Sequence, residues 1–227
     1  MPIGHQETGQ KNDLMTSIQN HDLEEILKRK NSRTKGGKIM YNHIKEIYQN
    51  NYFVSFYDDI SNEEKHYTGK INAFDKDLVL ISHINSRGEY DGYILKRIQD
   101  IFKISFNGKY EDKIKNLYEH KKQSHTLSLE NCKNIVKALF QYAISNKKIV
   151  RFETENSIVI GYVKKFDNDV AMILQLNDYA EKSSETCLNI DMFDTISVDT
   201  DYEQDLDILY SLSQMDSSSV SKQNPTH

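Results

Sequence analysis

Along this chain of 227 residues, the spacing of apolar and polar positions changes between helix-like and strand-like periods, and the same succession occurs twice. A helical spacing of apolar residues comes first, five short stretches with strand-like alternation follow, and a second helical spacing ends each copy. The pattern predicts helices around residues 44–48, 109–118, 136–143 and 201–210. It predicts strands over 53–59, 66–74, 78–84, 92–98 and 101–106, and again over 149–155, 158–166, 170–176, 185–191 and 193–199.

A duplicated module explains this repetition. GKINAFDKDLVLI, which begins at Gly69, returns 92 residues later as GYVKKFDNDVAMI, which begins at Gly161. Tyr-Glu at 110–111 returns at 202–203 with the same offset, so the register is kept from the first glycine into the last helix. We therefore expect two copies of one module, over residues 40–122 and 123–212.

Short, bent antiparallel strands between helices predict a mostly β, α+β protein with two tandem five-stranded small barrels, each preceded and followed by a short helix. The repeated signature has a structural interpretation, in which the glycine bends a strand, the phenylalanine fills the barrel and the aspartate caps a turn. The residues are Gly69, Phe74 and Asp75 in the first copy and Gly161, Phe166 and Asp167 in the second. A cation site at the same turns is the alternative, but no further carboxylates with calcium-loop spacing accompany these pairs.

Charge and composition narrow the class of protein. The formal net charge is −5, and the excess of acid lies in residues 123–212, which contain 8 Lys/Arg against 15 Asp/Glu. A surface that follows a phosphate backbone is normally basic, so the second copy is a poor candidate for nucleic-acid binding. No apolar run is long enough for a membrane span and no signal peptide is recognisable, so we expect a cytoplasmic protein without membrane contact. The two cysteines, Cys132 and Cys187, lack ligand spacing and are interpreted as reduced packing thiols.

The two ends of the chain match neither copy. Residues 1–39 are polar and weakly periodic, and we expect them to be either a disordered tail or an upstream segment translated ahead of a true start at Met40. Lys-Gly-Gly-Lys-Ile-Met, which ends at Met40, is consistent with a purine-rich ribosome-binding site in the gene. The Ser-rich residues 213–227 are predicted to be a disordered tail.

Motifs of catalysis are missing from the sequence. It contains no P-loop, GxGxxG, nucleophile elbow or zinc-ligand spacing, and its eight histidines are scattered. We therefore predict a protein that is not an enzyme, with no cofactor, no metal and no evident small-molecule substrate.

The repeated signature and the segments YILKRIQDIFKI and CLNIDMFDTISV resemble the two sequence motifs of the Sm-like (LSm, Hfq-like) superfamily, over roughly residues 42–106 and 134–198. The resemblance implies a bacterial small-barrel protein. It also implies rings in which the fourth strand of one barrel pairs with the fifth strand of the next, and single-stranded RNA bound on the ring faces.

Where the resemblance would place base-holding residues, this chain has Lys76-Asp77 and Asn168-Asp169, and carboxylates there repel phosphate. The expected function is therefore a non-catalytic binding or assembly module that engages a protein partner or associates with itself, and an RNA-binding regulator is the alternative. Lys96 and Arg97 are the candidate RNA contacts, or else a solvated strand face. Arg87, Tyr90 and Asp91, in the hairpin loop 85–92, are candidates for a partner contact, or else only turn the chain.

Overall fold

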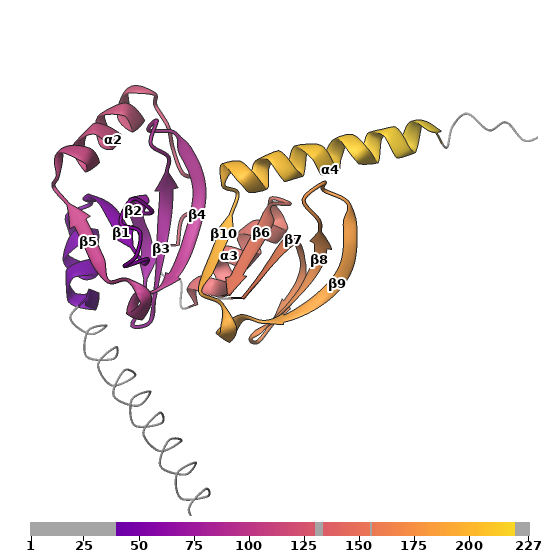
Figure 1. Ribbon diagram of the computed structural model, residues 1–227, viewed down its shortest axis with the longest axis horizontal. Coiled ribbons are helices and arrows are strands. Elements are labelled where there is room, and N and C mark those ends of the chain that lie inside the picture. Colours follow the sequence, from indigo (N-terminus) through magenta and orange to yellow (C-terminus); the bar gives the residue numbers. More distant parts are fainter. Residues whose placement is uncertain (1–39, 130–133, 155, 221–227) are drawn as a thin grey trace, which may run out of the picture.

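The computed structural model describes residues 40–129, 134–154 and 156–220, and it describes side chains as far as Met215. The expectations for residues 1–39, for Cys132 and for the end of the chain after Val220 lie outside the described residues. Figure 1 shows two curved β units side by side, with α2 against the first unit and α4 extending from the second.

The first copy begins with a helix over residues 40–49. It continues through β1 (Phe53–Tyr57), β2 (Tyr67–Phe74), β3 (Leu78–Ile84), β4 (Tyr90–Arg97), the 3-10 turn η1 (Ile98–Asp100), β5 (Lys103–Phe106) and α2 (Lys109–His120). The second copy comprises α3 (Ile135–Ser145), β6 (Ile149–Thr154), β7 (Ser157–Asp167), β8 (Val170–Leu176), β9 (Lys182–Asn189), η2 (Ile190–Met192), β10 (Thr195–Val198) and α4 (Asp201–Val220). The mostly β, α+β class predicted from the sequence is confirmed.

The prediction of two separate barrels is wrong. All the described strands belong to one 10-stranded antiparallel sheet with the order β5-β1-β2-β3-β4-β10-β6-β7-β8-β9, and this sheet is not closed. Each half repeats the same order, in which the fifth strand lies beside the first and the second, third and fourth strands follow. Closure of the first half would need β4 to pair with β5, but the edge of β4 is taken by β10 from the other half.

The hydrophobic core also joins the halves. Leu80 of β3 and Tyr93 and Leu95 of β4 belong to the same buried cluster as Phe140 of α3 and Ile196 of β10. Their neighbours Val79 and Ile81 point to the opposite face and pack in a second cluster with residues of β1 and of the first helix. Alternate residues of β3 therefore bury both faces of the sheet, as period-2 geometry requires.

Gly69 and Gly161 occupy equivalent positions at a close crossing of strands. A Cβ atom on Gly69 would lie 2.0 Å from the carbonyl oxygen of Ser82, and one on Gly161 would lie 2.0 Å from that of Leu174. Any larger residue would push the third strand away, so glycine is required by the approach of two backbones. A register shift follows each glycine, between Ile71 and Ala73 and at the matching place in β7, and such a bulge increases strand twist.

The other signature residues lie at the end of the second strand. Phe74 is half-buried against the rings of Tyr41 and Tyr48, and Phe166 is half-buried against Phe140, so both pack on the preceding helix of their copy. Asp75 accepts hydrogen bonds from the backbone N–H groups of Asp77 and Leu78, both at 2.8 Å, and so caps the turn into β3. Asp167 is exposed at the end of β7, where it pairs with Val170.

The expected tail over residues 213–227 is partly wrong, because α4 continues to Val220. The helix extends past the position that matches the end of α2. The Ser213 hydroxyl donates to the carbonyl oxygen of Tyr210 at 2.7 Å, so this residue bonds back to the preceding turn instead of interrupting the helix.

Candidate interaction surfaces

A seam of paired strands holds the two halves together. β4 and β10 are antiparallel, with Thr195 opposite Lys96, Ile196 opposite Leu95, Ser197 opposite Ile94 and Val198 opposite Tyr93. Every residue of β10 is buried. The fourth strand of one copy is thus joined to the fifth strand of the other within a single chain.

Gly92 marks the closest approach of the backbones at one end of the seam. Its φ angle is +69°, which favours glycine, and a Cβ atom there would lie 2.3 Å from the carbonyl oxygen of Val198. The sequence predicts Gly92 at the end of a loop, but β4 already begins at Tyr90, so Tyr90 and Asp91 are strand residues.

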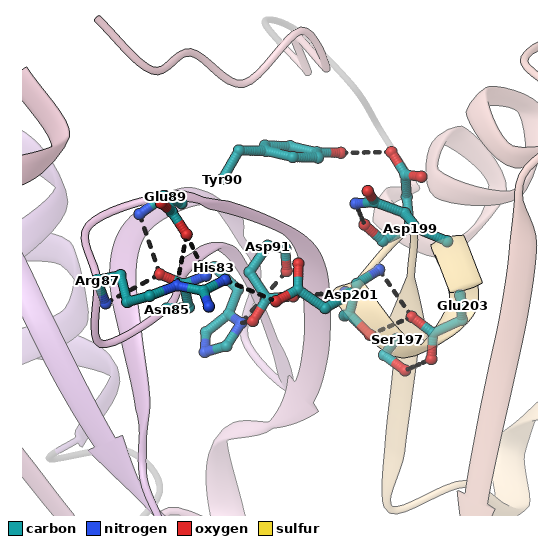
Figure 2. A network of polar contacts seen from close by, with 12 residues as sticks. His83, Asn85, Arg87, Glu89, Tyr90, Asp91, Ser197, Asp199, Asp201 and Glu203 are labelled. Atoms are coloured by element: carbon teal, nitrogen blue, oxygen red, sulfur yellow. Dashed lines mark hydrogen bonds and ion pairs between the residues drawn. The ribbon is translucent and has the colours of Figure 1, made fainter. Parts of the chain in front are cut away.

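Tyr90 and Asp91 contact the segment that leads into α4, as Figure 2 shows. The Tyr90 hydroxyl donates to Asp199 Oδ2 at 2.7 Å, and Asp91 Oδ1 accepts from the backbone N–H of Asp201 at 2.7 Å. Burial, and then the bond to Asp199, raise the pKa of Tyr90, so the phenol stays a neutral donor. Asp91 thereby satisfies a free N–H in the first turn of α4, where an anion is favoured.

The rest of the hairpin completes this network. His83 Nδ1 lies 3.0 Å from Asp91 Oδ2, and both side chains are largely buried. Arg87 is exposed and pairs with Glu89 at 2.7 Å and with Asp201 at 3.9 Å. Of the three residues predicted as a partner contact, Tyr90 and Asp91 therefore bind the second half of the same chain (Figure 2). Arg87 stays exposed, bound to Glu89 of its own hairpin and within 3.9 Å of Asp201.

Lys96 is buried, whereas both interpretations of the sequence, an RNA contact and a solvated strand face, predict an exposed side chain. It is 3% exposed, its ammonium is paired with Asp58, and it lies 4.5 Å from the centre of the Tyr67 ring. Asp58 shields the charge and the ring covers it, so Lys96 is neither a solvated strand face nor free to meet a phosphate.

Arg97 bridges the seam. Its Nε donates to the carbonyl oxygen of Phe193 at 2.9 Å, its guanidinium lies 4.7 Å from the centre of the Phe193 ring, and it also donates to the carbonyl oxygen of Asp191. The planar guanidinium therefore binds backbone carbonyl groups and an aromatic ring of the second half at the same time, which a lysine ammonium cannot do.

The connection between the halves is hydrogen-bonded to the strands of the first half. The backbone N–H of Leu127 donates to the Tyr93 hydroxyl at 2.7 Å, and its carbonyl oxygen accepts from Asn72 at 2.9 Å. His125 lies among tyrosine rings, with Nε2 at 2.8 Å from the carbonyl oxygen of His83 and Nδ1 at 2.9 Å from the Tyr118 hydroxyl. Burial lowers the pKa of His125 to about 4.

A polar cavity of about 560 Å³ lies beside the seam. Asp58, Lys96 and Glu153 line it together with Thr195, so it contains charges of both signs. Among the residues that the structure describes, no three histidine, cysteine or acidic side chains gather in a way that could hold a metal ion.

Two strand edges are left over. Among the described strands, β5 pairs only with β1 and β9 pairs only with β8. The two edges lie at opposite ends of the molecule in Figure 1. β9 is mostly exposed and includes the exposed thiol of Cys187. An unpaired edge presents a row of free backbone donors and acceptors to another strand.

The residues that the sequence analysis missed are acidic. Asp58 holds Lys96, while Asp199 and Asp201 meet the hairpin from more than 100 positions away along the chain. For Asp199 and Asp201 the signal was the excess of acid in the second copy, which was interpreted only as evidence against nucleic-acid binding there; Asp58 lies in the first copy, outside that excess.

The protein-family models, curated proteins and solved structures with which the chain was compared contain no match. Of the helices in the described ranges, none has both the length and the apolar character needed to cross a bilayer.

Proposed function

We propose that this protein is a non-catalytic, Sm-like assembly module whose copies join head to tail, the β9 edge of one molecule pairing with the β5 edge of the next. The observation that carries the proposal is the seam itself. There, a fourth strand and a fifth strand already pair in this way inside the chain.

The two free edges are the repeat equivalents of the two strands at the seam. β5 corresponds to β10 and β9 corresponds to β4, each at an offset of 92 residues. Transfer of the seam register to these edges places Ile104 opposite Cys187, Ser105 opposite Thr186, Lys103 opposite Leu188 and Phe106 opposite Glu185. No like charges oppose each other in this register, so the pairing carries no cross-strand repulsion.

The polar side chains of β9 make the edge selective. Lys182 and Glu185 are exposed on it, and charged residues on an edge discourage indiscriminate pairing. A specific partner strand has to match the register that these side chains allow.

The RNA-binding alternative has less support. Its two candidate contacts are Lys96, which is buried against Asp58, and Arg97, which is bound to the second half. A nucleic acid would have to bind to lysine or arginine side chains other than these two.

The register can be tested by cross-linking. In a Cys132→Ser background, Ile104→Cys places a thiol opposite the native Cys187 of a neighbouring molecule, and directly opposed residues have Cβ atoms about 5 Å apart. Mild oxidation should yield disulfide-linked dimers and higher multimers on a non-reducing gel, because the two thiols of one molecule lie at opposite ends of its sheet.

Two controls make the result specific. Lys103→Cys points to the other face of β5 and should cross-link far less, and Cys187→Ser should abolish the Ile104→Cys product. Cys187→Arg, at an exposed position, should lower the mass in solution measured by light scattering, whereas Cys187→Ser should preserve it. A wild-type protein that stays monomeric at high concentration would contradict the proposal, and poly-U binding lost on raising the salt would favour the RNA alternative.

A further inference from the structure

Large apolar side chains on the outer face of α4 are exposed to solvent. Ile208, Leu209 and Leu212 are 58%, 48% and 53% exposed, and we call these three residues the α4 stripe. Leu206 and Tyr210 of the same helix pack in a core cluster on the other side. A helix that is apolar on two sides is normally covered on both.

The fold of the module does not require this stripe, as the first copy shows. Asn116 and His120 of α2 occupy the positions of Ile208 and Leu212, and only Leu117 matches an apolar residue of the stripe. α2 nevertheless packs on its sheet through the buried Ile114, as α4 does through Leu206. The apolar character of the outer face is therefore a property added to the second copy alone.

A groove of about 570 Å³ lies next to the stripe, between α4 and α3. Ile144, Val163 and Leu174 give it an apolar lining, and Met215 of α4 forms part of its wall. Ile144 is 40% exposed although it is a large aliphatic side chain. The stripe and the groove lie on adjoining faces of α4, which lines the groove with Asp207, Tyr210, Ser211, Gln214 and Met215.

Charge separates the two parts of this surface. α4 contributes only acidic charges between residues 201 and 215, and Asp205 is exposed beside the stripe. The groove is bordered by the exposed Lys147 and Lys164, neither of which forms an ion pair with any residue in the described ranges. The groove also contains Lys148, which pairs with Asp199, and one acid, Asp207, which accepts a hydrogen bond from Tyr162, so its lysines leave it basic overall. An acidic apolar helix thus lies next to a groove with an excess of basic charge.

We propose that the α4 stripe of one molecule docks in the groove of a second copy, and that the second copy docks in return. A patch that contains a helix and the site complementary to it is self-complementary, which is the requirement for a two-fold interface. Asp205 of each molecule then faces Lys147 and Lys164 of the other, and the charges steer the pairing while the apolar side chains supply its free energy. This interface is independent of the strand edges.

The first test uses residues that the first copy already accepts. Ile208→Asn with Leu212→His gives α4 the residues of α2, so the fold should be retained. In a Cys187→Arg background, which removes edge pairing, we expect sedimentation equilibrium to give a dimer whose dissociation constant rises at least about tenfold in the double variant. Ile60→Asn, at a site 80% exposed on the first half, is the matched control and should leave the constant unchanged.

The second test fixes the occupant as a second copy. Asp205→Lys alone and Lys147→Glu with Lys164→Glu alone should each dimerise poorly, and an equimolar mixture of the two variants should recover the dimer, because both contacts are restored between unlike molecules. Three results would overturn the proposal: a monomeric Cys187→Arg protein, a dimer indifferent to the stripe variant, and a mixture that does not recover. Cross-linking through Ile104→Cys is unaffected by these outcomes, so the two proposals fail separately.

Discussion

At the residue scale, His125 shows how the connection between the halves is held on the first half. Its ring contacts Tyr90, Tyr93 and Tyr118, all of the first half. These aromatic neighbours exclude water, and the low-dielectric surroundings oppose protonation of the imidazole.

This burial predicts a loss of stability in weak acid. An unfolded histidine titrates near pH 6.5, whereas His125 in the folded chain has a pKa of about 4. Between these values the unfolded chain binds more protons, so stability falls as the pH drops below 6.5. At pH 5 the free energy of unfolding should be lower by about 2 kcal/mol than at pH 7.5 on account of this residue.

Urea denaturation at several pH values measures the effect. His125→Phe keeps a ring but cannot be protonated, so its stability should change less between pH 7.5 and pH 5 than that of the wild type. The variant is expected to lose about 1 kcal/mol for each of the two hydrogen bonds at any pH. Equal pH slopes for the two proteins would contradict the burial of a neutral imidazole.

At the element scale, the crossing of the second and third strands sets the shape of each half. Gly69 and Gly161 let β2 and β7 pass against the carbonyl groups of β3 and β8. The bulge that follows turns the strand, so that its end packs under the preceding helix through Phe74 or Phe166.

Gly161→Ala should therefore destabilise the protein severely. The added methyl group would lie 2.0 Å from the Leu174 carbonyl oxygen, and only a backbone shift relieves that overlap. Overpacking of this kind costs about 3 kcal/mol or more, which a shift in the urea midpoint would reveal. Ser183→Ala, on the exposed β9, should be close to neutral, and a comparably mild effect at Gly161 would show that the strands are not in close contact.

At the scale of the whole molecule, a shared core and a shared sheet make the two copies one cooperative unit. Leu95 of β4 and Ile196 of β10 oppose each other in the seam and lie in the same cluster. Neither copy can be removed without exposing the strand and the apolar side chains that the other covers.

Thermal unfolding should accordingly show one transition, with equal calorimetric and van't Hoff enthalpies. The fragment 40–129 provides the contrast, because it would expose the β4 edge together with the β5 edge. We expect it to form oligomers or to aggregate, as light scattering would reveal. Two separable transitions, together with a monomeric and stable fragment, would show that the copies are autonomous.

The local pattern of the sequence was enough to predict the helices and strands. Two helical spacings around five alternating segments, repeated at a constant offset, located the strands β3 and β8 without error and the other strands to within a few residues. This succeeded because side-chain periodicity is a local property of the backbone. The repeat also marked Gly69 and Gly161 as special positions in their strands, although the close approach of the neighbouring strand that requires glycine there is seen only in the structure.

The way in which the copies join depends on contacts that exist only in the folded chain. The pairing of β4 with β10 is made by hydrogen bonds between backbone groups. Because these groups are the same at every residue, the pattern of side chains does not predict which strands pair. The partners of Tyr90, Asp91 and Arg97 lie about 100 residues away along the chain, and Lys96 became buried because Asp58 and Tyr67 close over it. The predicted barrels were therefore replaced by one open sheet, in which residues expected to meet a partner contact the other half of their own chain.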